Sequence, residues 1–243
     1  MDNARIAVLL EPFLDQSLSS PALEQISIYI DLLLRWNARI NLTAVRNPDE
    51  IVTRHFGESF FLARHLFPKP VARTFPSAQG LSPSDSDAGA PPIAQVAMSG
   101  IPPHPRVLDL GSGAGFPALP IKIWSPNIHL TMIDSNHKKA TFLHEVTRSL
   151  ALMNINIISE RAETLVGKDP FQADVVTLRA VERFNTVLPL ATRFLAPAAH
   201  LALLISANQL SILPNLAPTI DWCQPISIPK SHSRVLAIGI HRA

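Results

Sequence analysis

The chain has 243 residues, of which 47% are hydrophobic and 16% charged, and it contains one cysteine, Cys223. This length and apolar content indicate a globular protein with a large core and exclude a mainly disordered chain. One cysteine excludes a disulfide framework and any site built from several thiolates. The net charge of +2 is only weak evidence for a polyanionic partner.

The N-terminus carries a short apolar run that Glu11 and Asp15 follow closely, a poor pattern for a signal peptide. No apolar run approaches the roughly 20 residues that a membrane helix needs. We therefore expect no membrane partner and a reducing compartment, which is the cytoplasm or, for a eukaryotic source, an organelle.

Residues 1–66 predict a helical N-terminal region. Apolar residues recur three and four positions apart between Leu23 and Ile40, and Ser20 before Pro21 is a good helix start. Asn47 to Glu50 supplies a second start, with a capping side chain, a first-turn proline and a glutamate at the third position. Basic residues dominate from position 35 to 73, namely Arg35, Arg39, Arg46, Arg54, Arg64, Lys69 and Arg73. This stretch is a candidate basic patch, although a solvated helix surface would read the same way.

Residues 67–105 hold nine of the 22 prolines, with serine and glycine between them. Proline locks its own backbone torsion and disfavours helix in the residue before it. We expect a long, largely disordered loop or linker here.

Residues 106–243 alternate apolar strand-like runs with helical ones, which predicts a parallel sheet with helices on both faces. The expected strands are 106–110, 129–134, 155–159, 173–178 and 200–205, the expected helices are 138–150 and 184–195, and a closing hairpin is expected from 225–228 and 235–240.

A glycine-rich loop follows the first expected strand and precedes a helix, the position of ligand sites in parallel sheets. Its glycines, Gly111, Gly113 and Gly115, follow a G-x-G-x-G pattern, and Phe116 occupies the third-glycine position of a dinucleotide fingerprint. The acidic Asp109 just before them suits a cofactor that carries a sulfonium and an ammonium better than a pyrophosphate.

Asp134 ends the second expected strand, where a carboxylate can accept hydrogen bonds from both ribose hydroxyls. An alternative is that Asp134 caps the following helix, with Ser135 and Asn136 as rival caps. Cys223 lies too late in the chain for a cytosine-C5 nucleophile, and the sequence shows no metal-ligand spacing.

Several motifs together resemble the ribosomal RNA small subunit methyltransferase G family, also called glucose-inhibited division protein B. The matching segments are Trp36-Asn37 with Asn41 to Arg46, Arg54-His55 with Glu58-Ser59, Asp109 to Pro117, Asp134-Ser135, Arg161 to Glu163 and Arg179 to Val181. The resemblance covers most of the chain outside the proline-rich insert. Two departures are Ala118-Leu119 for glycine-isoleucine, and Ile205-Ser206 for a lysine-glycine pair that ends the fifth strand.

The resemblance implies a class I S-adenosylmethionine-dependent methyltransferase domain over 106–243, with a Rossmann-like, mostly parallel sheet of seven strands and a helical N-terminal extension. It implies methyl transfer from S-adenosyl-L-methionine to N7 of a guanine in small-subunit ribosomal RNA, by a monomer without a metal. The cofactor-binding residues that it implies are Gly111, Gly113, Gly115, Phe116, Asp134, Ala162, Glu163 and Arg179.

Arg179 is the candidate catalytic residue, positioned to hold the acceptor edge of the guanine. On this basis Arg179→Ala is expected to lower turnover more than folding. The candidate RNA-binding residues are Arg35 and Arg39, expected one helical turn apart, together with Arg46 and Arg54. Trp36 and Asn41 are interpreted as structural residues of a helix end that packs on the sheet, and Glu58 as a possible structural partner of His55.

Two other functions stay open. The first is a methyltransferase of a protein or small molecule, in which the N-terminal arginines would be incidental. The second is a non-catalytic RNA-binding relative, suggested by the altered end of the fifth strand. A dinucleotide oxidoreductase is disfavoured because Phe116 replaces the glycine that it would need.

Overall fold

The computed structural model describes residues 1–69, 100–166, 172–181 and 183–242. Most of the proline-rich linker expected at 67–105 therefore lies outside the described residues. In the described part of the chain, no helix combines the length and the apolar character needed to cross a bilayer.

The centre of the molecule is an eight-stranded sheet in the order β3-β2-β1-β4-β5-β8-β6, with β7 paired to β8 outside this path. Its strands are β1 (Arg106–Leu110), β2 (His129–Ile133), β3 (Ile155–Ile158), β4 (Ala173–Arg179), β5 (Leu195–Ser206), β6 (Ile220–Trp222), β7 (Ile226–Ser227) and β8 (Arg234–His241). Strands β1 to β5 are parallel, and β8 runs antiparallel to β5 and β6. The order 3-2-1-4-5 is Rossmann-like and reverses between β1 and β4, which makes that edge a natural ligand site.

The expected mostly parallel sheet and the C-terminal hairpin are confirmed. Four of the five expected strands begin at the expected residue, whereas β5 begins at Leu195, five residues before His200. The three-residue β6 raises the number of strands above the expected seven, since β7 and β8 form the expected hairpin. Strand β6 was not expected, because three residues are too few to show a pattern.

The helices begin close to the expected positions. Those of the sheet region are α6 (Ala118–Trp124), α7 (His137–Ser149), α8 (Ala162–Leu165), α9 (Phe184–Thr192) and α10 (Leu213–Leu216), with the 3-10 helix η3 (Ala207–Ile212). Those of the N-terminal region are α1 (Asn3–Leu10), η1 (Glu11–Phe13), α2 (Ser20–Asn37), α3 (Pro48–Glu50), the π-helix η2 (Ile51–Gly57) and α4 (Glu58–Leu66).

The capping residues at the helix starts are of the expected types, but the cap of α2 lies one residue earlier than expected. Ser19, not Ser20, caps α2, because its side chain accepts a hydrogen bond from the amide of Ala22. Asn47 caps α3 as predicted and accepts hydrogen bonds from the amides of Asp49 (2.9 Å) and Glu50 (3.3 Å).

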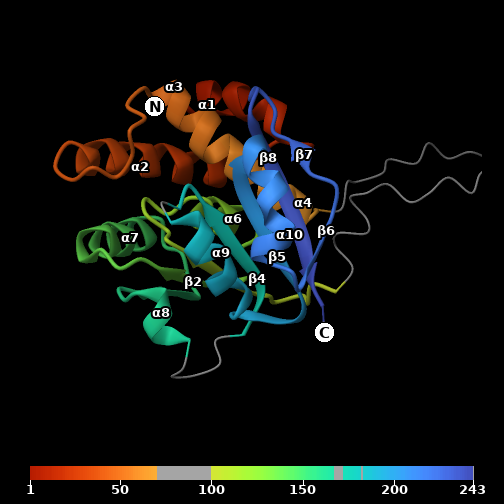
Figure 1. The fold of residues 1–243 in the computed structure, drawn as a ribbon. Helices are drawn as coiled ribbons and strands as arrows, with labels where there is room; N and C mark the ends of the chain where they lie inside the picture. The colour runs from red at the N-terminus through yellow and green to blue at the C-terminus, as the bar shows by residue number, and fades with distance from the viewer. Residues whose placement is uncertain (70–99, 167–171, 182, 243) are drawn as a thin grey trace, which may run out of the picture.

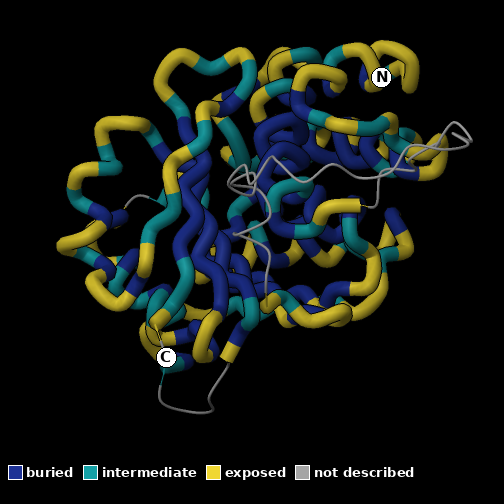
Figure 2. The backbone as a smooth tube through the Cα atoms, turned by 90° about the vertical axis from the view of Figure 1, so that its right-hand side faces the viewer, coloured by how far each residue is buried: buried dark blue, intermediate teal, exposed yellow. Residues whose placement is uncertain are grey.

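Two hydrophobic clusters cover the two faces of the sheet. Alternate residues of one strand face opposite sides, so Val107 belongs to one cluster and Leu108 to the other. The first cluster joins the sheet to α6, α7 and the N-terminal helices, and the second joins it to α9 and α10. Burial on both faces explains why these strands are continuous apolar runs (Figure 2).

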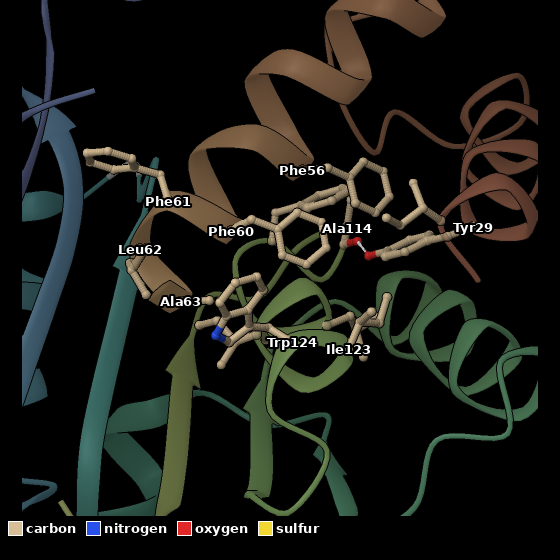
Figure 3. Packing of buried hydrophobic residues seen from close by; sticks show 14 of the residues in the cluster. Tyr29, Phe56, Phe60, Phe61, Leu62, Ala63, Ala114, Ile123 and Trp124 are labelled. Carbon is tan, nitrogen blue, oxygen red and sulfur yellow. Dashed lines mark hydrogen bonds between the residues drawn. The ribbon is translucent and has the colours of Figure 1, made fainter. Parts of the chain in front are cut away.

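The N-terminal helices lie across the carboxyl edge of the parallel strands, at the top of the molecule in Figure 1. In the core beneath them, Tyr29 of α2 packs edge-on against Phe56 with ring centroids 5.2 Å apart, and Trp124 lies next to Phe60 (Figure 3). These helices therefore share one core with the sheet and stand over the carboxyl edge of its parallel strands.

Gly239 of β8 provides a test of sheet packing. A Cβ atom there would lie 2.2 Å from Cγ2 of Ile220 and 3.2 Å from the carbonyl oxygen of Asp221. Gly239→Ala should therefore lower the free energy of unfolding by about 1–3 kcal/mol, measured by urea denaturation. Ile220→Ala should lower the free energy of unfolding less in the Gly239→Ala background than in the wild type. If the losses of the two substitutions are strictly additive in the double variant, the predicted clash is contradicted.

Candidate active site

The glycine loop connects β1 to α6 at the carboxyl edge of the sheet. Gly111, Gly113 and Gly115 all have positive φ, and the amides of Gly111 and Ser112 donate to the carbonyl of Ile133 at 2.8 and 3.1 Å. A Cβ atom on Gly115 would lie 2.5 Å from the hydroxyl oxygen of Tyr29, so only glycine fits there. The loop is thus held against the end of β2 with bare backbone facing outward at Gly111.

Tyr29 ties this loop to the N-terminal helices. Its hydroxyl donates a hydrogen bond to the carbonyl oxygen of Ala114, drawn as a dashed line in Figure 3. Burial raises the pKa of Tyr29 well above its ordinary value, and the charge of Asp109 raises it further, so the hydroxyl stays a donor. Helix α2 therefore fixes the position of the loop.

Asp134 joins the end of β2 to the glycine loop. Its Oδ2 accepts from the amide of Gly113 at 2.8 Å, and its Oδ1 accepts from the amide of Asn136 at 2.8 Å. The cap of α7 is Asn136, whose Oδ1 accepts from the amides of Lys138 and Lys139. The alternative in which Asp134 caps this helix is therefore wrong. Each carboxylate oxygen has a further lone pair that a ribose hydroxyl can use.

Asp109 is a buried carboxylate beneath the loop. Thr177 donates to its Oδ1 at 2.6 Å, whereas its Oδ2 has no hydrogen-bond partner within the described ranges. Burial raises the pKa of Asp109 to about 6, against the opposing effect of hydrogen bonds from Thr177 and Ser112. An anionic oxygen without a partner fits a positively charged ligand at this end of β1.

Arg179, at the end of β4, begins a chain of hydrogen bonds that runs into the N-terminal helices. Its Nη1 lies 3.1 Å from Nδ1 of His55, and Nε2 of His55 lies 2.8 Å from Oγ1 of Thr43. Arginine can only donate, so Nδ1 accepts and the neutral ring donates from Nε2 to Thr43. Burial, followed by the charges of Arg179 and Arg54, lowers the pKa of His55 to about 3.

Glu58 of α4 binds two arginines with one oxygen. Its Oε2 accepts from Nη2 of Arg179 at 3.0 Å and lies 3.1 Å from Nη2 of Arg234. The sequence had suggested His55 as the partner of Glu58, but its partners in the structure are these two arginines. Burial lowers the pKa of Arg179, and Glu58 opposes this effect.

A cavity of about 320 Å³ opens beside this cluster, at the ends of β4 and β5 and the start of β8. Its lining includes Arg54, Arg179, Val181 and Arg234. A Cβ atom on Gly111 would lie 3.3 Å from Cγ1 of Val181, so the cavity adjoins the glycine loop. A larger cavity of about 710 Å³ lies at the opposite edge, where β1, β2 and β3 begin.

The sequence did not single out Arg234. Arg234 pairs with Ser206 across the β5–β8 ladder, and this antiparallel register places Arg234 at the end of β5. Only its position at the start of an apolar strand marks it in the sequence, and that is not a functional signal.

The implied cofactor residues are only partly brought together. Gly111, Gly113 and Asp134 meet through the contacts above, and Gly115 is packed beneath Tyr29. Phe116 is a buried core residue stacked on Tyr29 at 5.2 Å, and its ring also stacks on His55 at 4.9 Å.

Ala162 and Glu163 lie on α8, which follows β3, a strand two places from β1 in the sheet. Ala162 is half-buried and Glu163 is exposed.

The four candidate RNA-binding arginines are all exposed. Helix α2 ends at Asn37, so the expectation that Arg35 and Arg39 share one helical face is wrong. Arg46 donates to the carbonyl of Asn37 at 3.0 Å, and Arg54 pairs with Glu50 at 3.1 Å.

Asn37 terminates α2 by bending the chain back. Its Oδ1 accepts from the amides of Leu42 and Thr43, and its Nδ2 donates to the carbonyl of Thr43. Asn37 thus has the structural role that was expected of Asn41, which is exposed. Trp36 packs on the sheet region as expected, because its Nε1 donates to Glu145 of α7 at 2.9 Å.

Comparison with known proteins agrees with these features. A family model described as "rRNA small subunit methyltransferase G" matches residues 22–71 and 94–212. A protein of Roseiflexus castenholzii named "Ribosomal RNA small subunit methyltransferase G" is 34% identical over 226 residues, which are 89% of this chain and 82% of that protein. A protein of the same name from Chloroflexus aggregans is 32% identical over 231 residues, or 91% of this chain and 82% of that protein.

Among solved structures, the YcgJ protein from Bacillus subtilis is similar with a TM-score of 0.49 and 15% identity, covering 62% of this chain and 98% of that one.

The described residues contain no group of histidine, cysteine, aspartate and glutamate that could hold a metal ion.

The buried Asp109 predicts a pH-dependent stability. The unfolded carboxyl loses its proton near 3.8 and the folded one near 6, so charging it destabilises the fold as the pH rises through this window. The free energy of unfolding of Asp109→Asn should therefore rise relative to that of the wild type by up to about 3 kcal/mol as the pH increases from 4 to 7, measured by urea denaturation of the free protein. A difference that stays constant over this window would contradict the prediction.

His55 should resist protonation. Its folded pKa near 3 lies below the ordinary 6.5, so the neutral ring contributes stability above 6.5 that is lost as the pH falls toward 3. Nitrogen-15 NMR of the ring, assigned with His55→Asn, should show the neutral tautomer protonated at Nε2 at pH 5. A ring that titrates near 6.5, or one protonated at Nδ1, would rule out the hydrogen-bond chain from Arg179.

Proposed function

The chain belongs to the rRNA small subunit methyltransferase G family, and on that premise we propose that it transfers a methyl group from S-adenosyl-L-methionine to N7 of a guanine in small-subunit ribosomal RNA. The observation that carries the proposal is the contact between two sites at one sheet edge. The glycine loop of β1 adjoins, through Gly111 and Val181, a cavity lined by arginines.

The loop fits the methyl donor. Gly111 is exposed and Asp134 has lone pairs free, which suits the close approach of a nucleoside and its ribose hydroxyls. The oxygen of Asp109 that has no partner lies beneath the same loop and suits a positive charge. When bound, S-adenosylmethionine supplies a methyl group on a sulfonium, with a neutral thioether as the leaving group.

The acceptor chemistry needs no general base. Guanine N7 has a lone pair and no proton to remove, so the residues of the site have to place it in line with the methyl group. Positioning of this kind can contribute roughly 7–11 kcal/mol in favourable cases. The cavity beside Gly111 is the place from which a base can approach the donor.

Within this proposal Arg179 is a positioning residue. Both its Nη atoms are occupied, by His55 on one side and by Glu58 and the carbonyl of Arg54 on the other. It therefore acts by holding the wall of the cavity in place. The exposed Arg35, Arg39, Arg46 and Arg54 are proposed to contact RNA phosphates, which would make binding depend on salt.

The reaction can be tested directly. The protein is incubated with labelled S-adenosylmethionine in four parallel samples. These contain naked small-subunit RNA, assembled small subunits, total protein or small metabolites. Label is measured in each sample, and the nucleosides of the RNA samples are analysed by mass spectrometry. We expect 7-methylguanosine in one or both RNA samples. Label confined to protein or small molecules would favour the other enzyme class, and an absence of heat on titration with S-adenosylmethionine would favour a non-catalytic protein.

Arg179 offers a second test, and burial changes what is expected. Its side chain is 7% exposed, so Arg179→Ala should lower the free energy of unfolding by about 3 kcal/mol as well as turnover, because it breaks a buried ion pair. Arg179→Lys keeps the charge but cannot reach all three partners, so it should fold better than Arg179→Ala and still lower kcat. Unchanged kcat in a folded Arg179→Lys protein would exclude the positioning role.

A further inference from the structure

The cavity at the ends of β4 and β5 carries an excess of positive charge. Three of its lining residues are arginines, Arg54, Arg179 and Arg234. Within the cluster Glu58 pairs with two of them, and Arg54 of η2 pairs with Glu50 of α3 at an exposed position. Two guanidinium groups that share one carboxylate oxygen leave about one positive charge uncompensated at the wall.

Two of these arginines carry a hydrogen-bond donor that is unpaired among the described residues. The Nε atoms of Arg179 and Arg234 are buried and have no partner in the part of the chain that the structure describes. Buried donors of this kind normally find a partner, and these two belong to arginines that line the cavity, which points to a ligand with acceptor oxygens there. Both donors belong to cations, which makes an anion the matching ligand.

Of the two arginines that bind Glu58, Arg234 is the better placed to meet that ligand. Its side chain is 22% exposed, compared with 7% for Arg179. Gln209 lies nearby and accepts with Oε1 from the amide of Ser206 at 3.0 Å, so its NH2 group remains available as a further donor.

We propose that Arg234 and its neighbours bind a phosphate group of the RNA backbone next to the methylated guanine. This inference rests on the proposed function and assigns the part of the acceptor nucleotide that the far end of the cavity holds. The base lies toward Gly111 and the phosphate toward β8. Glu58 holds Arg234 in place, because the oxygen that binds Arg179 also binds Arg234.

The sheet order favours the RNA phosphate over the carboxylate of the methyl donor. Strand β8 is three places from β1, and adjacent strands lie about 4.8 Å apart, so the backbone of Arg234 lies roughly 14 Å across the sheet from β1. The loop and Asp134 are on the β1–β2 side, whereas the arginines are on the β4–β5–β8 side.

The first experiment compares Arg234→Gln with Arg242→Gln. Arg242 follows the far end of the same strand and pairs with Asp221 at an exposed position, so it is the matched control. Binding of small-subunit RNA is measured at several salt concentrations with S-adenosylhomocysteine present, together with the affinity for S-adenosylmethionine alone. Arg234→Gln should weaken RNA binding roughly tenfold or more and reduce the salt slope by about one, with the cofactor affinity unchanged.

These readouts do not require methylation, so they separate this inference from the proposed reaction. If RNA is methylated but Arg234→Gln and Arg242→Gln bind it equally, the phosphate site is wrong and the reaction stands. If Arg234→Gln weakens cofactor binding instead, the anion is the methionine carboxylate, and the RNA assignment is overturned.

A second measurement remains decisive if Arg234→Gln folds poorly. A series of short RNA substrates is prepared, and in each one a single backbone phosphate next to the methylated guanine is replaced by an uncharged methylphosphonate. The wild-type protein should lose affinity at one position, and Arg234→Lys, which keeps the charge, should lose affinity there as well. A wild-type protein insensitive to all of these replacements would overturn the phosphate site.

Discussion

The ion pairs at Glu58 determine how the N-terminal helices meet the sheet. One oxygen of this buried carboxylate, on α4, binds Arg179 at the end of β4 and Arg234 at the start of β8. Charges at this depth are tolerated only when they are paired and hydrogen-bonded, so the three segments must come together for any of them to be buried. The cavity wall and the neutral state of His55 both follow from this arrangement.

A second constraint acts on the glycine loop. Tyr29 donates to the carbonyl of Ala114 from above, and Gly115 leaves the space that its hydroxyl occupies. Phe116 stacks beneath the same ring. The helices of the first 66 residues thus form part of the site, because they hold the loop from one side while Asp134 holds it from the other. A loop that is fixed on both sides needs little rearrangement when a ligand binds.

Several residues were interpretable from sequence because their roles are local. The caps at Asn47 and the strand runs depend on neighbours a few residues away, and so does the turn at Gly111. Other features could not be predicted, either because nearby residues competed for one role or because a distant segment makes the contact. Asn37 rather than Asn41 folds the chain back after α2, which separates Arg39 from the helix that carries Arg35. The motif around Phe116 also did not show that three aromatic neighbours from the N-terminal helices pack around its ring.

The sequence by itself determined the α/β class, the position of the glycine loop and the family, because periodicity and motif spacing are properties of contiguous residues. Only the tertiary structure decided which charges meet. Arg179 and Arg234 are far apart in the chain, and the β5–β8 register and the docking of α4 bring them to one oxygen of Glu58. Pairing across a sheet depends on strand order and register, which no local pattern specifies.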